Sequence, residues 1–90
     1  MWINPHASGT RSILRIRTWD RPGVLTKIVK MLKDISVNVV SAEIDTIGDE
    51  VDDTFYVTYH GQALPGQVEQ LVINMMSYEL GLPNVNADSY

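Results

Sequence analysis

The sequence predicts an α+β domain in which two helices cover one face of a mostly antiparallel sheet. Its 90 residues are the size of one domain. Three segments have the alternation or the β-branched content typical of strands, and two segments repeat apolar residues at helical spacing. Glycines and prolines separate these segments, so the elements follow in the order β-α-β-β-α, with a more weakly marked strand at the C-terminus.

The chain is expected to begin with a flexible lead-in over residues 1–11, with Trp2 available to dock it on the domain. A strand follows over residues 12–19, where Leu14 and Ile16 share one face and two arginines share the other. It ends at the sequence Asp-Arg-Pro-Gly, residues 20–23, because proline and glycine interrupt a central strand.

The first helix is predicted from Val24 to about residue 35. Its apolar stripe consists of Val24, Ile28, Leu32 and Ile35. Asp20 is expected to act as the N-cap by accepting backbone N–H bonds from the first turn. Pro22 then stands where its missing N–H removes no helical hydrogen bond.

Two strands are predicted next, over residues 37–47 and 53–59, joined by a hairpin turn in which Gly48 takes a positive φ. On the second of these strands, Phe55 and Val57 are expected to meet the helices. On the strand over residues 37–47, the face that is more apolar at its centre is also expected to meet the helices. That face comprises Asn38, Val40, Ala42, Ile44 and Thr46.

The second helix is predicted to begin near Pro65, since proline is favoured in a first turn. Gly81 is expected to close it in a left-handed cap and Pro83 to prevent its continuation. Its apolar stripe comprises Val68, Leu71, Val72 and Met75, with Met76 and Leu80 beside it. An edge strand over residues 85–90 completes a βαββαβ order, the ferredoxin-like arrangement, and residues 12–90 form the single domain.

The composition excludes several classes of function. With 7 Lys+Arg against 11 Asp+Glu, the net charge is −4, whereas nucleic-acid binders depend on cationic contacts to phosphates. The chain has no cysteine and only two histidines, so we expect no metal, no cofactor and no enzymatic activity. No apolar run approaches the ~20 residues that span a bilayer, so no membrane partner is expected, and residues 1–11 have no signal-peptide pattern.

The loop over residues 20–23 is the main candidate for a binding site. A helix N-terminus presents unpaired N–H groups and a partial positive charge, which suit a carboxylate. Gly23 lets a ligand approach the backbone closely, and Asp20 offers the opposite charge for an ammonium group. The alternative from the residues alone is an ordinary strand–helix turn with a capping aspartate.

Four other patterns have simpler explanations. The acidic residues between 49 and 53 lack the spacing of a calcium loop and are expected to form a solvated hairpin turn. Residues 56–59 are similar to part of an RNA-recognition strand, but acidic residues stand where that motif has basic ones. His6 and His60 are not at metal-ligand spacing, and methionines at helical spacing are typical of a core.

These patterns together resemble the ACT domain, a regulatory module that senses small molecules, over residues 13–80. Residues 20–25 resemble the family's strand–loop–helix entry, and residues 37–39 resemble the start of its second strand. The hairpin is similar to the ACT repeats of plant and algal multi-ACT proteins and of bacterial uridylyltransferases. The residues that carry this likeness are Ala42, Ile44, Thr46, Gly48, Asp49, Val51 and residues 53–58, with Gly61 and Leu64 beyond.

The resemblance implies a non-catalytic regulatory domain that binds a small metabolite, usually an amino acid, at or near the interface between two ACT domains. Such a domain modulates assembly or the activity of a partner, with a metabolic enzyme as the candidate. Carried over by position, the ligand contacts are Asp20, Arg21, Pro22, Gly23, Val24 and Leu25, with Asn38 and Val39 from the other wall. The expected location is intracellular, in the plastid stroma for a plant or alga and otherwise in the cytoplasm.

The strand over residues 37–47 is expected to be an edge strand, and its apolar start leaves backbone groups available to a second strand. We therefore expect a homodimer through this strand and the first helix. One alternative is a dimerisation or interaction domain that binds no ligand. Another is a hydrolase of the acylphosphatase type, for which the loop offers only Arg21, beside Asp20.

Overall fold

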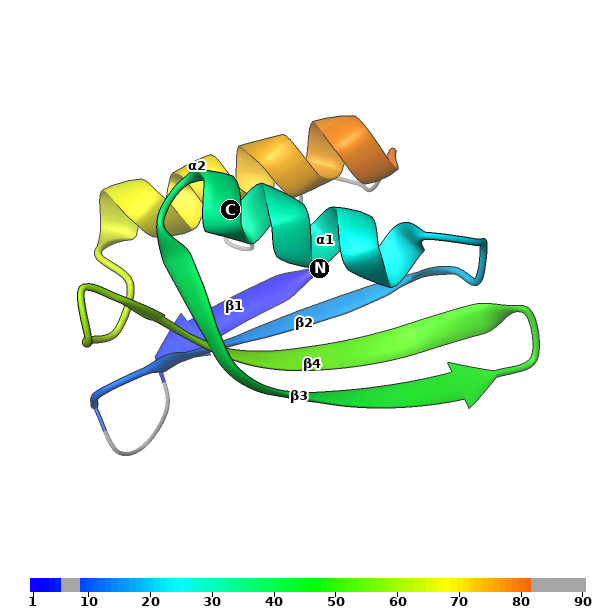
Figure 1. The fold of residues 1–90 in the computed structure, drawn as a ribbon, viewed down its shortest axis with the longest axis horizontal. Coiled ribbons are helices and arrows are strands. Elements are labelled where there is room, and N and C mark those ends of the chain that lie inside the picture. The colour runs from blue at the N-terminus through cyan, green and yellow to red at the C-terminus, as the bar shows by residue number, and fades with distance from the viewer. Residues whose placement is uncertain (6–8, 82–90) are drawn as a thin grey trace, which may run out of the picture.

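A computed structural model describes residues 1–5 and 9–81, which form a four-stranded sheet with two helices on one face (Figure 1). The elements are β1 (Trp2–Pro5), β2 (Ser12–Trp19), α1 (Val24–Asp34), β3 (Val37–Ile47), β4 (Glu50–Tyr59) and α2 (Gly66–Leu80). The spatial order is β1-β2-β4-β3, and all neighbouring strands are antiparallel. The predicted α+β, ferredoxin-like fold is confirmed, with β3 at one edge of the sheet.

The N-terminal segment, expected to be a lead-in, contributes the short strand β1. Ile3 stands opposite Leu14 and packs against the core, whereas the side chain of Trp2 is 45% exposed. The strand pairs with backbone groups of β2 that would otherwise stand at a sheet edge. Sequence analysis missed it because four residues that include a proline are too few to show an alternation. The strand predicted over residues 85–90, and Pro83, lie outside the described residues.

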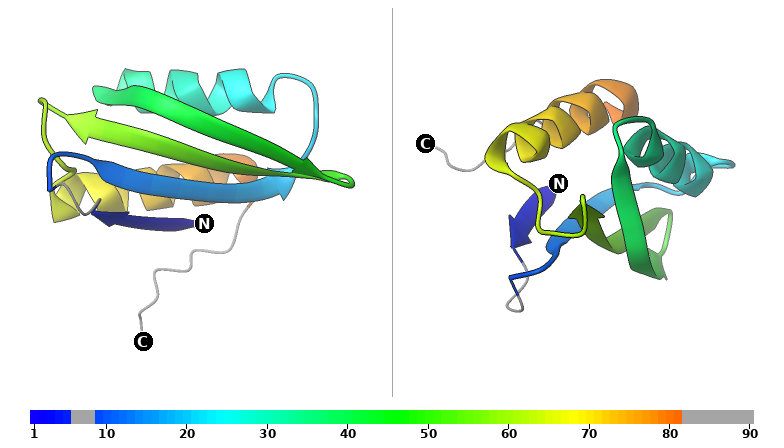
Figure 2. Two further views of the ribbon diagram at one scale, coloured as in Figure 1. Left: turned by 90° about the horizontal axis from the view of Figure 1, so that it is seen from below. Right: turned by 60° about the vertical axis from the view of Figure 1, so that its left-hand side comes forward.

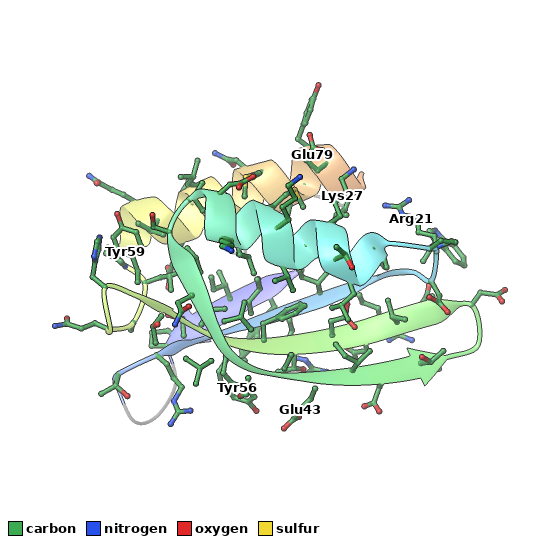
Figure 3. The ribbon with its side chains drawn as sticks, viewed as in Figure 1. Arg21, Lys27, Glu43, Tyr56, Tyr59 and Glu79 are labelled. Carbon is green, nitrogen blue, oxygen red and sulfur yellow. The ribbon has the colours of Figure 1, made fainter. Side chains whose placement is uncertain are left out.

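The core lies between the sheet and the helices. Its most deeply buried members have no exposed surface and are Leu14, Ile16, Ile28, Leu32, Phe55, Val57, Val72 and Met76. The buried face of α2 is rotated from the prediction, because Ile73 is buried while Leu71 is 47% exposed. Gly81 ends α2 in the left-handed conformation, as predicted, with a φ of 67°. On the surface, Lys27 of α1 and Glu79 of α2 form an ion pair at 3.4 Å (Figure 3).

The predicted inward face of β3 is correct only for the second half of the strand. The pairing with β4 shifts between Val39 and Ser41, which leaves Val40 as the extra residue of a bulge. Because a shift of one residue exchanges the faces of a strand, Val37 and Val39 face the core before the bulge, and the predicted Asn38 and Val40 do not. After it, Ala42, Ile44 and Thr46 face the helix side, opposite Phe55, Asp53 and Val51.

The tip of the β3–β4 hairpin extends beyond the N-terminal end of α1 (Figures 1 and 2). For this reason Ala42, Ile44 and Thr46 face the helix layer and yet are exposed, with Ile44 exposed to 44%. Ala42 and Ile44 therefore face the helix side, as predicted, but they are not buried against the helices. Their exposure leaves an open space between the end of the hairpin and the start of α1.

Candidate functional site

The loop over residues 20–23 joins β2 to α1 and is held against the β3–β4 turn. The backbone N–H of Asp20 donates a hydrogen bond to the carbonyl of Asp49 at 2.8 Å. All the side chains of this loop are exposed, and Arg21 projects outward at the N-terminal end of α1 (Figure 3). This hydrogen bond holds the loop next to the end of the hairpin, so residues of both segments lie around the same space.

The start of α1 differs from the prediction. Its N-cap is Gly23, with a φ of 77°, and no side chain caps the helix. Asp20 is therefore not the N-cap, and Pro22 lies in the loop before the helix instead of in its first turn. A β-carbon at Gly23 would meet no atom within 4 Å, so glycine is required here by the backbone conformation. The N–H of Val24 donates to the carbonyl of Arg21 at 3.2 Å, so the N–H groups of Leu25 and Thr26 are the ones available to a ligand.

The loop, the start of α1 and the end of the hairpin enclose a cavity of about 220 Å³. We call it the loop cavity. It is lined by Asp20, Arg21, Gly23, Val24, Leu25 and Thr26, and by Ile44, Thr46, Val51 and Asp53. The structure thus brings together all the predicted ligand contacts over residues 20–25 except Pro22, which lies beside them in the loop.

The other two predicted contacts, Asn38 and Val39, do not line this cavity. They follow the C-terminal end of α1, whereas the loop cavity is at its N-terminal end. A helix of 11 residues is about 16 Å long, so one chain does not bring the two groups together. Asn38 is exposed, and Val39 is half-buried against the core.

Asp53 is the site residue that sequence analysis missed, because it was assigned to a solvated acidic turn. It lies on the inward face of β4 with only 1% of its surface exposed, and neither carboxylate oxygen has a hydrogen-bond partner among the described residues. Burial raises the pKa of Asp53 above its usual value, and the nearby charges of Asp52 and Asp20 raise it further. The alternation of β4 could have predicted that Asp53 is buried, since Asp53 shares its face with Phe55 and Val57.

The neighbouring acidic residues instead face the open side of the sheet, where they pair with arginines of β2. Arg15 and Asp52 form an ion pair at 3.0 Å, and Arg17 and Glu50 form one at 2.8 Å. Among residues 1–5 and 9–81, no three histidine, cysteine or carboxylate side chains gather as a metal site would need. Over the same residues, no helix has the length and apolar character needed to cross a membrane.

A two-layer α+β fold with a cavity where the first helix begins is compatible with a small-ligand-binding regulatory module, although the same fold serves other functions. Comparison with known proteins identifies the family. Over 80 residues the chain is 39% identical to a protein named "ACT domain-containing protein DS12, chloroplastic", found in Oryza sativa subsp. indica and in subsp. japonica. The match covers 89% of this chain and 28% of the rice proteins, so the chain spans less than a third of their length. The chain belongs to the ACT domain family. No family model matches it, and no solved structure matches it significantly.

Proposed function

We propose that this domain is a non-catalytic sensor that binds an amino acid in the loop cavity. The observation that supports this is the combination of opposite charges in one small space. The N-terminus of α1 and the guanidinium of Arg21, which forms no ion pair with a described residue, suit a carboxylate. The exposed carboxylate of Asp20, on the same cavity, adds a negative charge that attracts an ammonium group. A free amino acid carries both.

We propose further that a second copy of the chain completes the site. The edge strand β3 and the outer side of α1 expose the apolar residues Val40, Ile44, Leu25 and Val29. If two β3 strands pair antiparallel around a twofold axis, the start of one lies beside the end of the other. Asn38 and Val39 of the second copy then approach the loop cavity of the first, which accounts for their distance from it within one chain.

Regulation follows from linkage between binding and pairing. A ligand held between two chains binds the dimer more tightly than the monomer, so it raises the dimer population and changes the surface offered to a partner such as a metabolic enzyme. The rice relatives carry the word chloroplastic in their names, which supports the plastid stroma as the location if this chain comes from a plant or alga.

The proposal is tested by calorimetric titration of the protein with each of the twenty L-amino acids, on the wild type and on Gly23→Val. The variant is expected to lose binding, because its side chain enters the space next to the first-turn N–H groups. Gly61→Val is the matched control. Gly61 has a φ of 78°, an added β-carbon there also meets no atom within 4 Å, and it does not line the loop cavity.

Both substitutions are expected to strain the backbone by a similar amount, so their melting temperatures should fall together while only Gly23→Val loses the ligand. If no amino acid binds the wild type at millimolar concentration, the sensing proposal is wrong and the ligand-free dimerisation domain replaces it. Equal loss of binding in both variants would attribute the effect to strain alone.

A further inference from the structure

We propose that Asp53 makes the loop cavity selective for ligands with a cationic group, by pairing its buried carboxylate with the ammonium of the ligand. The inference rests on the proposed function, because it assigns a recognition role inside the same cavity. It adds Asp53 of β4 as a ligand contact, whereas the contacts that the family resemblance implies are in the loop, in α1 and in β3.

Asp53 carries a carboxylate that is buried and unpaired among the described residues. Asp53 is 1% exposed, and no described residue donates a hydrogen bond to either of its oxygens. Buried carboxylates in proteins are nearly always hydrogen-bonded or ion-paired, because an unpaired charge in an apolar surrounding is costly. Such a group in a cavity wall is explained if its partner arrives with the ligand.

The described residues around Asp53 offer its carboxylate no suitable partner. The residues opposite Asp53 on the neighbouring strands are Ile16 and Ile44, which are apolar. Within the loop cavity the only other charged side chains are Asp20, which has the same sign, and Arg21, which is exposed. The adjacent Asp52 faces the open side of the sheet and is paired with Arg15.

The two walls of the loop cavity favour opposite charges. The N-terminal end of α1 forms one wall, where a partial positive charge and N–H groups favour a carboxylate. Asp53 lies in the opposite wall, on β4, so an amino acid would be oriented with its ammonium toward the sheet. Leu25 and Ile44 also line the cavity and are 39% and 44% exposed. Exposed side chains change rotamer within nanoseconds, and this is the movement by which the ammonium would reach Asp53.

The test compares two ligands that differ only in the ammonium group. Calorimetry with the twenty L-amino acids selects the one that binds the wild type most tightly. The same protein is then titrated with the 2-hydroxy acid counterpart of that amino acid, in which a hydroxyl replaces the ammonium. Charged hydrogen bonds are stronger than neutral ones, so we expect the hydroxy acid to bind about 10- to 100-fold more weakly.

The second arm repeats both titrations on Asp53→Asn. We expect this variant to lose the preference for the amino acid over the hydroxy acid, which a merely structural role of Asp53 would leave intact. Asp45→Asn is the control, because it removes an exposed carboxylate of β3 that does not line the cavity, and it should keep the preference.

The outcomes separate this inference from the proposed function. If amino acids bind but the wild type binds the hydroxy acid equally well, the role of Asp53 is refuted while the sensing function stands. A preference that persists in Asp53→Asn also refutes it. If no amino acid binds at all, the proposed function fails, and the inference fails with it.

Discussion

Asp53→Asn should make the ligand-free domain more stable at neutral pH. The substitution keeps the shape of the side chain and removes its charge. A buried polar group without a partner costs about 1–3 kcal/mol, and more when it is charged. Because the asparagine amide is itself only partly satisfied in this place, we expect a gain of about 1–2 kcal/mol in the free energy of unfolding. In a domain of this size, each kcal/mol corresponds to roughly 4–8 °C in melting temperature.

The gain in stability of Asp53→Asn over the wild type should increase as the pH rises from acidic to neutral. The folded-state pKa of Asp53 is raised above its ordinary value of 3.8, chiefly by burial. The folded protein therefore binds this proton more tightly than the unfolded chain, and stability is lost as the pH rises through the raised pKa. Well below pH 3.8 the carboxyl is protonated in both states, so the difference between wild type and Asp53→Asn should be large at neutral pH and vanish at strongly acidic pH.

The assay is urea unfolding of both proteins at neutral pH and at acidic pH, without ligand. Asp49→Asn serves as the control, because it removes an exposed carboxylate at the hairpin turn, and its effect should stay within about 0.5 kcal/mol at either pH. A variant no more stable than the wild type at neutral pH, or a gain that does not change with pH, would refute this account of Asp53. A confirmed gain would mean that the domain retains a destabilising residue at the proposed ligand site.

Three further predictions concern the fold. Phe55→Ala, at a side chain with no exposed surface, should lower the free energy of unfolding by about 3–5 kcal/mol in urea, and a loss below about 1 kcal/mol would contradict the described core. Ser12→Ala should cost about 1–3 kcal/mol in the same assay, because the buried hydroxyl accepts the N–H of Leu64 at 3.0 Å; an unchanged midpoint would show that this bond is absent in solution. Arg15→Ala should change stability by less than about 1 kcal/mol, since its ion pair is exposed, and thermal melting in low and high salt would reveal any larger contribution.

The elements that the sequence predicted best are those with an unambiguous period. In β2 the apolar Leu14 and Ile16 alternate with arginines, and the strand has the predicted bounds. On α1 the predicted apolar stripe Val24, Ile28 and Leu32 is the buried face of the helix. In these segments a single orientation buries the apolar residues, so local pattern and tertiary packing agree.

The errors occurred where the pattern allowed two solutions. The start of β3 has valines on both faces, so alternation did not decide which face is inward, and the bulge at Val40 exchanges them. At Asp53 two patterns disagreed. Its charge predicted an exposed side chain, whereas its position in the alternating strand indicated a buried one, and the side chain is buried. The cap at Gly23 depends on a backbone conformation that a side-chain pattern does not encode.

The central claim, that ligand binding and pairing of chains are coupled at the loop cavity, is tested most directly by sedimentation equilibrium of the wild-type protein. The dimer dissociation constant is measured without ligand and with a saturating amount of the amino acid that binds most tightly in calorimetry. We predict a lower dissociation constant with the ligand present, and no change in Gly23→Val. A dissociation constant unaffected by the ligand, or a monomer in both conditions, would contradict the account.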